Sequence, residues 1–318
     1  MKKNFVLLIM LLGQLSIASA QSLSKYQKPF SRYTVNPDSC IRIEHTSGSL
    51  IFIESKAIVS DAKKVDILYR EFLTPLDMLV HGIQMHVDIA GERFPLESTG
   101  MFELYALDGS DTLKFNPEKR MEVRLNGPKE IKPGVEGYKY NRKDPHWESY
   151  TSMISNRAIG DDSDLWGSSI VDEQVEVFNE DAFSAYVDTV QQKVFQSMEI
   201  DDFGFYNYDR IIEGLEYVYI QPNFVATNKK EIKSTIYVVY NEINSVFYFS
   251  EYNWAEAFFL IKDEPYKMFT IAENGQVLKL ESFPDITNVE DSPVSFALKA
   301  QKEIPTDNQS LAKLTGIQ

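Results

Sequence analysis

Three short runs of sequence decide the fold: GSLIFI at residues 48–53, VDILYREF at residues 65–72 and MEVRL at residues 121–125. In the third run Met121, Val123 and Leu125 alternate with charged residues, and this period of two is typical of a strand with one buried face. Short strands separated by regularly spaced turns favour a sandwich over alternating strands and helices. Residues 40–126 are therefore predicted to form an N-terminal β-sandwich.

Two local signals within this region predict a short helix and a turn. Thr74 can accept a hydrogen bond from the exposed amides of a helix start, Pro75 suits the first helical position, and Asp77 lies in the favourable first turn. Gly82 is a suitable stop, so we expect one or two helical turns between the strands. The dipeptide Asp108-Gly109 predicts a turn.

Length and charge limit the organisation and the partners. A chain of 318 residues is too long for one average domain and indicates two. It carries 47 acidic against 32 basic residues, a formal net charge of −15. An acidic surface of this size repels phosphate backbones, so nucleic acid is not expected as a partner.

The first twenty residues read as a signal peptide. Lys2 and Lys3 precede an apolar run at residues 5–12, and Ala18-Ser19-Ala20 supplies the small residues of a cleavage site before Gln21. The run is too short to span about 30 Å of hydrocarbon. We expect export through the Sec route to the periplasm, the outer-membrane periphery or the exterior, and no transmembrane segment in the mature chain.

The remaining boundaries follow from composition and periodicity. Residues 21–39 are polar with two prolines and read as an extended leader, whereas residues 127–178 hold many Gly and Pro turn sites and read as an irregular linker. Helical spacing of apolar residues predicts one amphipathic helix at residues 179–200. Residues 201–300 return to short apolar runs, with an Asn-Gly hairpin signal, and predict a C-terminal β-sandwich; residues 301–318 read as a frayed tail.

Chemistry-bearing residues are sparse. No nucleophile elbow, phosphate-binding loop, dinucleotide fingerprint or zinc-protease motif occurs, so we assign no catalytic, cofactor-binding or metal residue and expect no cofactor. His81 and His86 could hold zinc with Asp88, or could simply face solvent around a glycine turn. Residues 161–164 could bind calcium weakly through their oxygens. Cys40 can pair with a second chain or be a buried apolar residue at a strand start.

One polar cluster lies among aromatic residues, and we interpret it as a structural junction that locks the helix onto the second sandwich. Its polar groups need hydrogen-bond partners if they are buried, either as Asp209 with Arg210 or as Asn207 with a backbone edge. The junction residues are Phe203, Gly204, Phe205, Asn207, Asp209 and Arg210.

The runs at residues 48–53, 65–72, 74–77, 82–85 and 97–103 resemble a family of exported, uncharacterised β-rich proteins of Bacteroidetes bacteria. That family has a strand-rich module, then a helix and a motif like the run at residues 204–210, commonly with Trp where this chain has Phe205. The resemblance implies architecture and compartment, but no activity.

Two wider resemblances concern fold and modification. The N-terminal module is similar to the protein-binding β-sandwich of ankyrins and netrin receptors, and the C-terminal part looks like an immunoglobulin or transthyretin sandwich. Asp111-Thr112-Leu113 is similar to the short acceptor pattern for O-linked sugars in these bacteria, which makes Thr112 a candidate glycosylation site.

Three hypotheses about function follow. The first is a non-catalytic envelope or surface protein that binds or scaffolds proteins or glycans. The second is a carboxylate-dependent hydrolase of polysaccharide or peptide with its site between the two domains. The third is a small-ligand binder, which would need a closed apolar cavity. Fold alone does not decide among them, and the first is the reading we expect.

Overall fold

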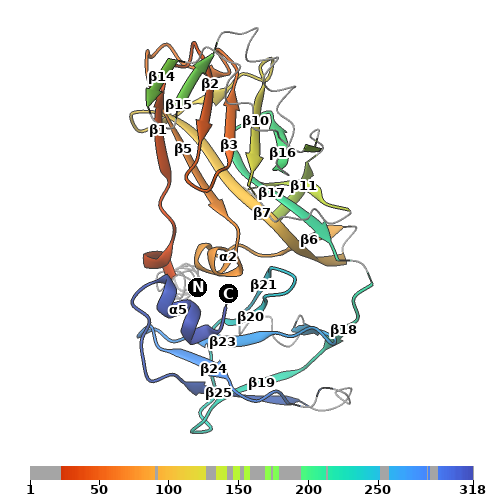
Figure 1. Ribbon diagram of the computed structural model, residues 1–318. Helices are drawn as coiled ribbons and strands as arrows, with labels where there is room; N and C mark the ends of the chain where they lie inside the picture. Colours follow the sequence, from red (N-terminus) through yellow and green to blue (C-terminus); the bar gives the residue numbers. More distant parts are fainter. Residues whose placement is uncertain are drawn as a thin grey trace, which may run out of the picture. The chain divides into compact units, whose positions relative to one another are not determined.

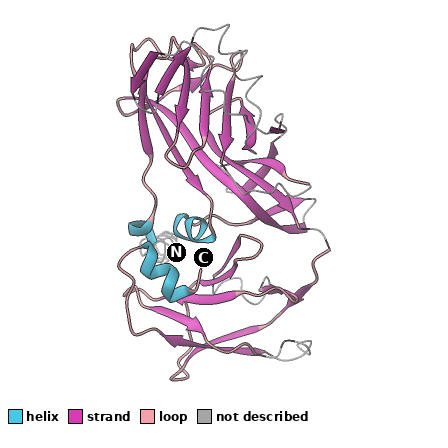
Figure 2. Cartoon of the chain, viewed as in Figure 1, coloured by secondary structure: helices cyan, strands magenta, loops and turns pink. Residues whose placement is uncertain are grey.

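Strands make up most of the described chain, as the sequence predicted (Figure 2). The computed structural model describes residues 23–89, 92–126, 134–141, 146–150, 154–157, 169–172, 175–178, 195–212, 214–250, 258–284, 286 and 293–317. The chain divides into two compact units. We call Pro29–Leu73 with His86–Ile211 the N-terminal unit, and the described residues up to Lys28, Thr74–Met85 and Ile212 onward the C-terminal unit.

The N-terminal unit contains one eight-stranded sheet, called sheet A, in the order β1-β5-β7-β17-β11-β12, with β6 and β8 also paired to β7 (Figure 1). Its strands are β1 (Ser31–Val35), β5 (Val65–Phe72), β6 (His86–Ile89), β7 (Glu92–Asp108), β8 (Asp111–Thr112), β11 (Glu136–Asn141), β12 (His146–Tyr150) and β17 (Gly204–Ile211). Every strand pair in this sheet is antiparallel.

The same unit contains a seven-stranded sheet, called sheet B, in the order β13-β16-β10-β3-β2-β15-β14. Its strands are β2 (Cys40–Glu44), β3 (Leu50–Ile53), β10 (Met121–Leu125), β13 (Ile154–Arg157), β14 (Ser169–Asp172), β15 (Val175–Phe178) and β16 (Phe195–Ile200). A short ladder joins β4 (Ile58–Val59) to β9 (Lys114–Phe115).

A single apolar core lies between sheets A and B. Alternate residues of β1, β2, β3, β5, β7, β10, β16 and β17 point into it, so the period of two in the sequence becomes one face of these strands. The residues buried there include Ile41, Ile43, Ile51, Ile53, Val65, Ile67, Tyr69, Phe102, Leu104, Ala106, Met121, Val123, Leu125, Met198, Ile200, Tyr206 and Tyr208. The predicted N-terminal sandwich is therefore present, with strands from well beyond residue 126.

The charged side chains of β10 are buried as well, which simple alternation does not predict. Arg124 is completely buried, its Nε donates to Glu122 Oε1 at 2.6 Å, and its guanidinium lies 4.6 Å from the ring centroid of Phe52. Ser197 of β16 also donates to Glu122. Pairing and stacking compensate the loss of hydration that an isolated buried charge would suffer.

Several predicted boundaries are wrong for the described residues. The leader contains β1, and the linker contains β11 to β15, because their backbone groups pair with partners distant in sequence. The last six residues of the predicted helix 179–200 form β16, paired to β10 and β13. Residues 179–194 lie outside the described residues. Ladder pairing, with Met198 opposite Val123, overrides the local helical spacing here.

The C-terminal unit is built on a six-stranded sheet in the order β19-β25-β24-β23-β20-β21, beside the two-stranded sheet β18-β22. Only the β19–β25 pair is parallel in these two sheets. The strands are β18 (Tyr217–Tyr219), β19 (Pro222–Ala226), β20 (Ile236–Tyr240), β21 (Ser245–Phe249), β22 (Phe259–Ile261), β23 (Lys267–Ile271), β24 (Val277–Leu280) and β25 (Val294–Ala300). The predicted hairpin joins β23 to β24, with Gly275 at φ +82°.

Aromatic side chains dominate the core of this unit. Phe258 lies against Phe224, Phe249 and Phe296, with ring centroids 4.7–5.7 Å apart. Such ring pairs add to the free energy gained from burying their area. The high aromatic content of the sequence is thus concentrated in a packed interior.

Helices complete the C-terminal unit: η1 (Ser24–Tyr26), α2 (Pro75–His81) and α5 (Asn308–Thr315). The predicted tail is therefore wrong at residues 308–315, where Asp307 caps α5 and Leu311 is fully buried. Long-range hydrogen bonds hold the three segments of the unit together. The Tyr26 hydroxyl donates to the carbonyl of Pro305 at 2.6 Å, and the Tyr248 hydroxyl donates to that of Met78 at 2.8 Å.

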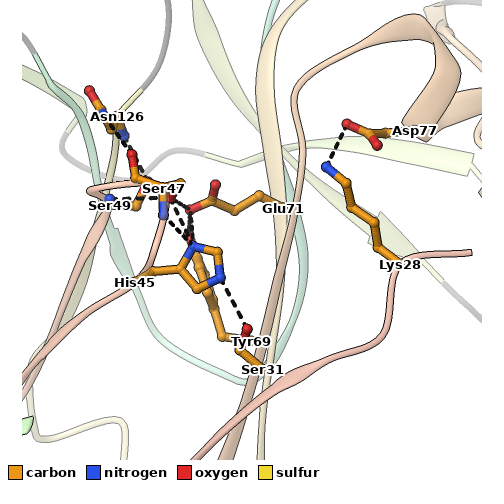
Figure 3. A network of polar contacts seen from close by, with 9 residues as sticks. All are labelled: Lys28, Ser31, His45, Ser47, Ser49, Tyr69, Glu71, Asp77 and Asn126. Atoms are coloured by element: carbon orange, nitrogen blue, oxygen red, sulfur yellow. Dashed lines mark hydrogen bonds and ion pairs between the residues drawn. The ribbon is translucent and has the colours of Figure 1, made fainter. Parts of the chain in front are cut away.

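Helix α2 confirms the predicted start and stop. Thr74 Oγ1 accepts from the amide of Asp77 at 3.2 Å, the Asp77 carboxylate accepts from the amide of Thr74 at 3.2 Å, and Gly82 ends the helix at φ +68°. Lys28 forms an ion pair with Asp77 at 2.9 Å (Figure 3). Although it follows β5 in sequence, α2 belongs to the C-terminal unit and not to the predicted N-terminal domain.

Replacing Thr74 by Ala removes the cap acceptor of α2 and should lower the free energy of unfolding by about 1 kcal/mol. Urea unfolding followed by circular dichroism measures the change. Thr74→Ser keeps the hydroxyl and should lie close to wild type. An equal loss in the Ser variant would show that the capping hydrogen bond does not account for the effect.

Candidate functional site

The six predicted junction residues lie in the N-terminal unit, on or just before β17. This strand pairs with β7 and β11 in the middle of sheet A, so it does not join a helix to the second sandwich. Phe203 lies 6.1 Å from Phe115, and Phe205 lies 4.9 Å from Trp147, ring centroid to ring centroid. Gly204 pairs opposite Leu104. The cluster therefore lies within sheet A, a different part of the molecule from the predicted junction.

The predicted pairing of Asp209 with Arg210 is also wrong. Neighbouring residues of a strand point to opposite faces, so their side chains cannot meet easily. Arg210 Nε instead donates to the buried carboxylate of Glu97 at 2.5 Å, and Asn207 Nδ2 donates to Asp209. Burial raises the pKa of Asp209 well above its ordinary value, against the lowering effect of hydrogen bonds from Ser98 and Asn207. The charge of Glu97 raises it further.

The other singled-out residues do not converge on one site. Thr112 is exposed on β8. Cys40 is buried, and its Sγ accepts from the Ser55 amide at 3.4 Å, which fits the interpretation as an apolar strand residue. His81 donates through Nδ1 to the carbonyl of Asp77. Burial, aided by the charge of Arg93, lowers the pKa of His86 to about 4.

No group of three or more metal-ligating side chains occurs within the part of the chain that the structure describes. The candidate calcium residues 161–164 lie outside that part. Within it, no helix has the length and apolar character needed to cross a membrane.

A polar network that the sequence reading missed lies at one end of the N-terminal sandwich (Figure 3). His45, Ser47 and Ser49 come from the connection between β2 and β3 in sheet B, whereas Ser31 and Glu71 come from β1 and β5 in sheet A. Ser31 Oγ lies 3.1 Å from His45 Nε2, and His45 Nδ1 lies 3.5 Å from Glu71 Oε1. The imidazole thus lies between a hydroxyl and a carboxylate.

The connection is held in a fixed shape by tight backbone contacts. The amide of Gly48 donates to the carbonyl of His45 at 2.8 Å, and Gly48 has φ +88°. A Cβ at this position would lie 2.8 Å from Asn126 Nδ2, which itself donates to the carbonyl of Ser47 at 2.6 Å. Glycine is required here for both conformation and space, and the resulting turn directs His45 and Ser47 toward Glu71.

Glu71 is the buried anchor of this network. Its Oε1 accepts from the hydroxyls of Ser47 at 3.0 Å and Tyr69 at 2.8 Å. Burial by itself would raise the pKa of Glu71, but hydrogen bonds from His45, Ser49 and Tyr69 and the charge of His45 together outweigh it, so the pKa lies below its ordinary value. Glu71 is therefore ionised at neutral pH. Burial and this negative charge raise the pKa of Tyr69 well above its usual range, so Tyr69 remains a donor.

One sequence signal could have revealed the network. In the run at residues 65–72, Val65, Ile67 and Tyr69 point inward, and the same alternation places Glu71 on the inward face. A charged residue at an inward position needs partners, because an uncompensated buried charge is costly. Its partners Ser31 and His45 come from other strands, and their proximity has no sequence signature.

A second feature, in the C-terminal unit, is aromatic and exposed. Tyr217 and Tyr219 lie two residues apart on β18, and both contact Phe259 of β22, with ring centroids 5.4 and 6.2 Å away. Phe259 is buried, Tyr217 is half-buried and Tyr219 is 69% exposed. Burial, with a smaller effect of Tyr219, raises the pKa of Tyr217 to about 12, so its hydroxyl stays neutral.

Comparisons with protein-family models, with curated proteins and with solved structures found no match. The predicted membership of a Bacteroidetes family therefore stays a prediction, and the candidate sites are argued from this chain alone.

Replacing Glu71 by Gln should lower the free energy of unfolding at pH 7 by about 1.5–3 kcal/mol, because the hydrogen bonds made to a charged acceptor are lost. The folded pKa is below the ordinary value, so this contribution is complete above about pH 4.5 and disappears as pH falls through the folded pKa. Urea unfolding at pH 7 and pH 3.5 measures it. Glu44→Gln, at an exposed position on β2, is the control. An equal loss of unfolding free energy in Glu71→Gln at both pH values would contradict the conclusion that Glu71 stabilises the fold in its ionised form.

Replacing Asp209 by Asn should stabilise the protein at neutral pH, although the side chain is fully buried. A raised folded pKa means that the native state holds a proton that the unfolded chain releases above about pH 3.8, so Asp209 lowers stability as pH rises. The difference between variant and wild type should grow by up to about 1.4 kcal/mol per pH unit between pH 4 and the folded pKa. Melting curves from pH 4 to 8 test this, with Asp66→Asn as control; a pH-independent difference would refute it.

Proposed function

We propose that this protein is an exported cell-envelope or surface protein that binds a neutral glycan through Tyr217 and Tyr219. The observation that carries the proposal is the exposed aromatic pair on β18, supported from beneath by Phe259. Export is supported by residues 1–20, which have the composition of a signal peptide. The general role is the binding or scaffolding role expected from the sequence.

The geometry of the pair suits a chain of sugar rings. Side chains two positions apart on a strand lie on the same face, at a spacing of about 6.6 Å. A tyrosine ring offers an apolar surface to the C–H face of a sugar and a hydroxyl to its polar edge, and it loses little conformational entropy on binding. Because contacts with Phe259 limit the movement of both rings, the surface is preorganised.

Charged groups next to the pair add hydrogen-bonding capacity. Glu216 precedes Tyr217 and forms an exposed ion pair with Lys262, which follows β22. The Lys262 ammonium can donate to sugar hydroxyls, and the Glu216 carboxylate can accept from them. The net charge of −15 disfavours anionic polysaccharides, so the occupant that fits best is a neutral glycan.

Affinity electrophoresis and calorimetry with neutral and acidic polysaccharides test this proposal. Wild type should be retained by at least one neutral glycan, and Tyr219→Ala should weaken binding about tenfold, since one stacked ring contributes about 1.4 kcal/mol. Tyr219→Phe should keep most of the affinity because the ring surface remains. Phe283→Ala, at an exposed ring that contacts Tyr266 instead, should have no effect.

Two results would overturn it. Retention by no neutral glycan would refute the ligand class, and unchanged binding in a correctly folded Tyr219→Ala variant would refute the site. The alternative is that this surface binds an envelope protein and not a glycan. A photo-crosslinking residue at position 219 distinguishes the two, because it would then capture an envelope protein.

A further inference from the structure

We infer that Ser31 is a nucleophile, activated by His45 and Glu71, that accepts an acyl group from carboxylic esters. This activity lies in the N-terminal unit and goes beyond the proposed binding function, which rests on residues of the C-terminal unit. The required parts of such a site are a hydroxyl, an imidazole that accepts its proton and an acceptor that orients the imidazole.

The distances connect these parts in order. Ser31 Oγ lies 3.1 Å from His45 Nε2, within the range for proton transfer to a general base. On the other side of the ring, His45 Nδ1 lies 2.8 Å from Ser47 Oγ and 3.5 Å from Glu71 Oε1. Ser47 Oγ lies 3.0 Å from the same Glu71 oxygen. The imidazole is therefore linked to the carboxylate both directly and through one hydroxyl (Figure 3).

Activation of Ser31 requires the proton of neutral His45 to be on Nδ1. The Ser47 hydroxyl donates to Glu71, which leaves its oxygen able to accept from Nδ1–H at the shorter distance of 2.8 Å. The competing contact, in which the Ser47 amide donates to Nδ1, is longer at 3.3 Å. An ionised carboxylate beside Nδ1 favours a proton there, and in this tautomer Nε2 accepts from Ser31.

Glu71 is the most deeply buried of the three groups. The side chain of Glu71 is 4% exposed and that of His45 is 13% exposed, and Ser31 is half-buried at the start of the edge strand β1. The carboxylate is thus protected from water, where its effect on the imidazole is strongest. In the proposed site the substrate would approach Ser31 from the start of this edge strand.

The chemistry is a two-step acyl transfer. Ser31 Oγ attacks the ester carbonyl carbon while its proton moves to His45 Nε2, and the imidazolium then gives that proton to the departing alkoxide, which leaves as an alcohol. Water attacks the acyl-serine with His45 again as base, which releases the carboxylic acid and restores the Ser31 hydroxyl. The negative charge of Glu71 stabilises the imidazolium in both steps.

Covalent labelling of the purified full chain by a fluorophosphonate tests the inference. The Ser31 oxygen would form a bond to phosphorus with loss of fluoride, and intact-mass and peptide analysis should place one adduct on Ser31. Ser31→Ala should remove the adduct, and His45→Gln should slow labelling about 100-fold, within the contribution usual for general-base catalysis. In both variants, the rate at which p-nitrophenol is released from p-nitrophenyl butyrate should fall together with the labelling.

Ser110→Ala is the matched control, because Ser110 is an exposed serine whose hydroxyl donates to Asp111 and has no histidine contact among the residues that the structure describes. It should label like wild type. Absence of an adduct on wild type, or an adduct that persists in Ser31→Ala, would overturn the inference. If Ser31→Ala does not fold, the His45→Gln rate and the mapped position of the adduct on wild type still decide the question. Glycan binding is measured separately, so each proposal can fail without the other.

Discussion

The pairing of β17 with β7 is the constraint on which the N-terminal unit depends. It joins residues about one hundred positions apart and places β17 in the middle of sheet A, with β11 on its other side. Tyr206 and Tyr208 point from it into the core between the sheets. A register shift between Tyr208 and Asp209, opposite Gly100 and Ser98, changes the course of the ladder at that point. Because the paired residues lie far apart in the sequence, this unit has a non-local topology. Its strands can pair only after the long intervening loops have closed.

Two buried carboxyl groups near this sheet have opposite electrostatic states, and their partners explain why. Glu71 receives several donors and a neighbouring imidazole, so its charged form is stabilised despite burial. Asp209 is fully buried near Glu97, and two donors do not offset the loss of hydration. The number and charge of the partners, and not burial alone, therefore decide which carboxyl group is charged.

The two candidate sites suggest different ways in which a β-rich scaffold carries function. The Tyr217–Tyr219 surface uses rings held by the underlying core and needs no reactive group. The Ser31–His45–Glu71 set lies where a connection of one sheet meets strands of the other. Neither site depends on a recognisable motif, since each combines ordinary residues whose arrangement gives them their properties.

The sequence by itself determined the local structure. Period-two alternation identified β2, β5 and β10, a short apolar run identified β3, and the signals at Thr74 and Gly82 identified α2, because these patterns depend only on neighbouring residues. The aromatic, polar run at residues 203–210 was predicted to be buried among hydrogen-bond partners, and most of it forms β17. Its partners could not be predicted, since they come from β7 and β11.

Only the tertiary structure decided the assignment of strands to sheets and the composition of the sites. The helical spacing before Ile200 gave a wrong prediction for β16, because ladder pairing with β10 outweighs local preference. His45 and Ser31 had no signal in the sequence, since their chemistry arises from distances across two sheets. Sequence patterns report which face of an element is buried, whereas which faces meet is determined by packing and pairing over long separations.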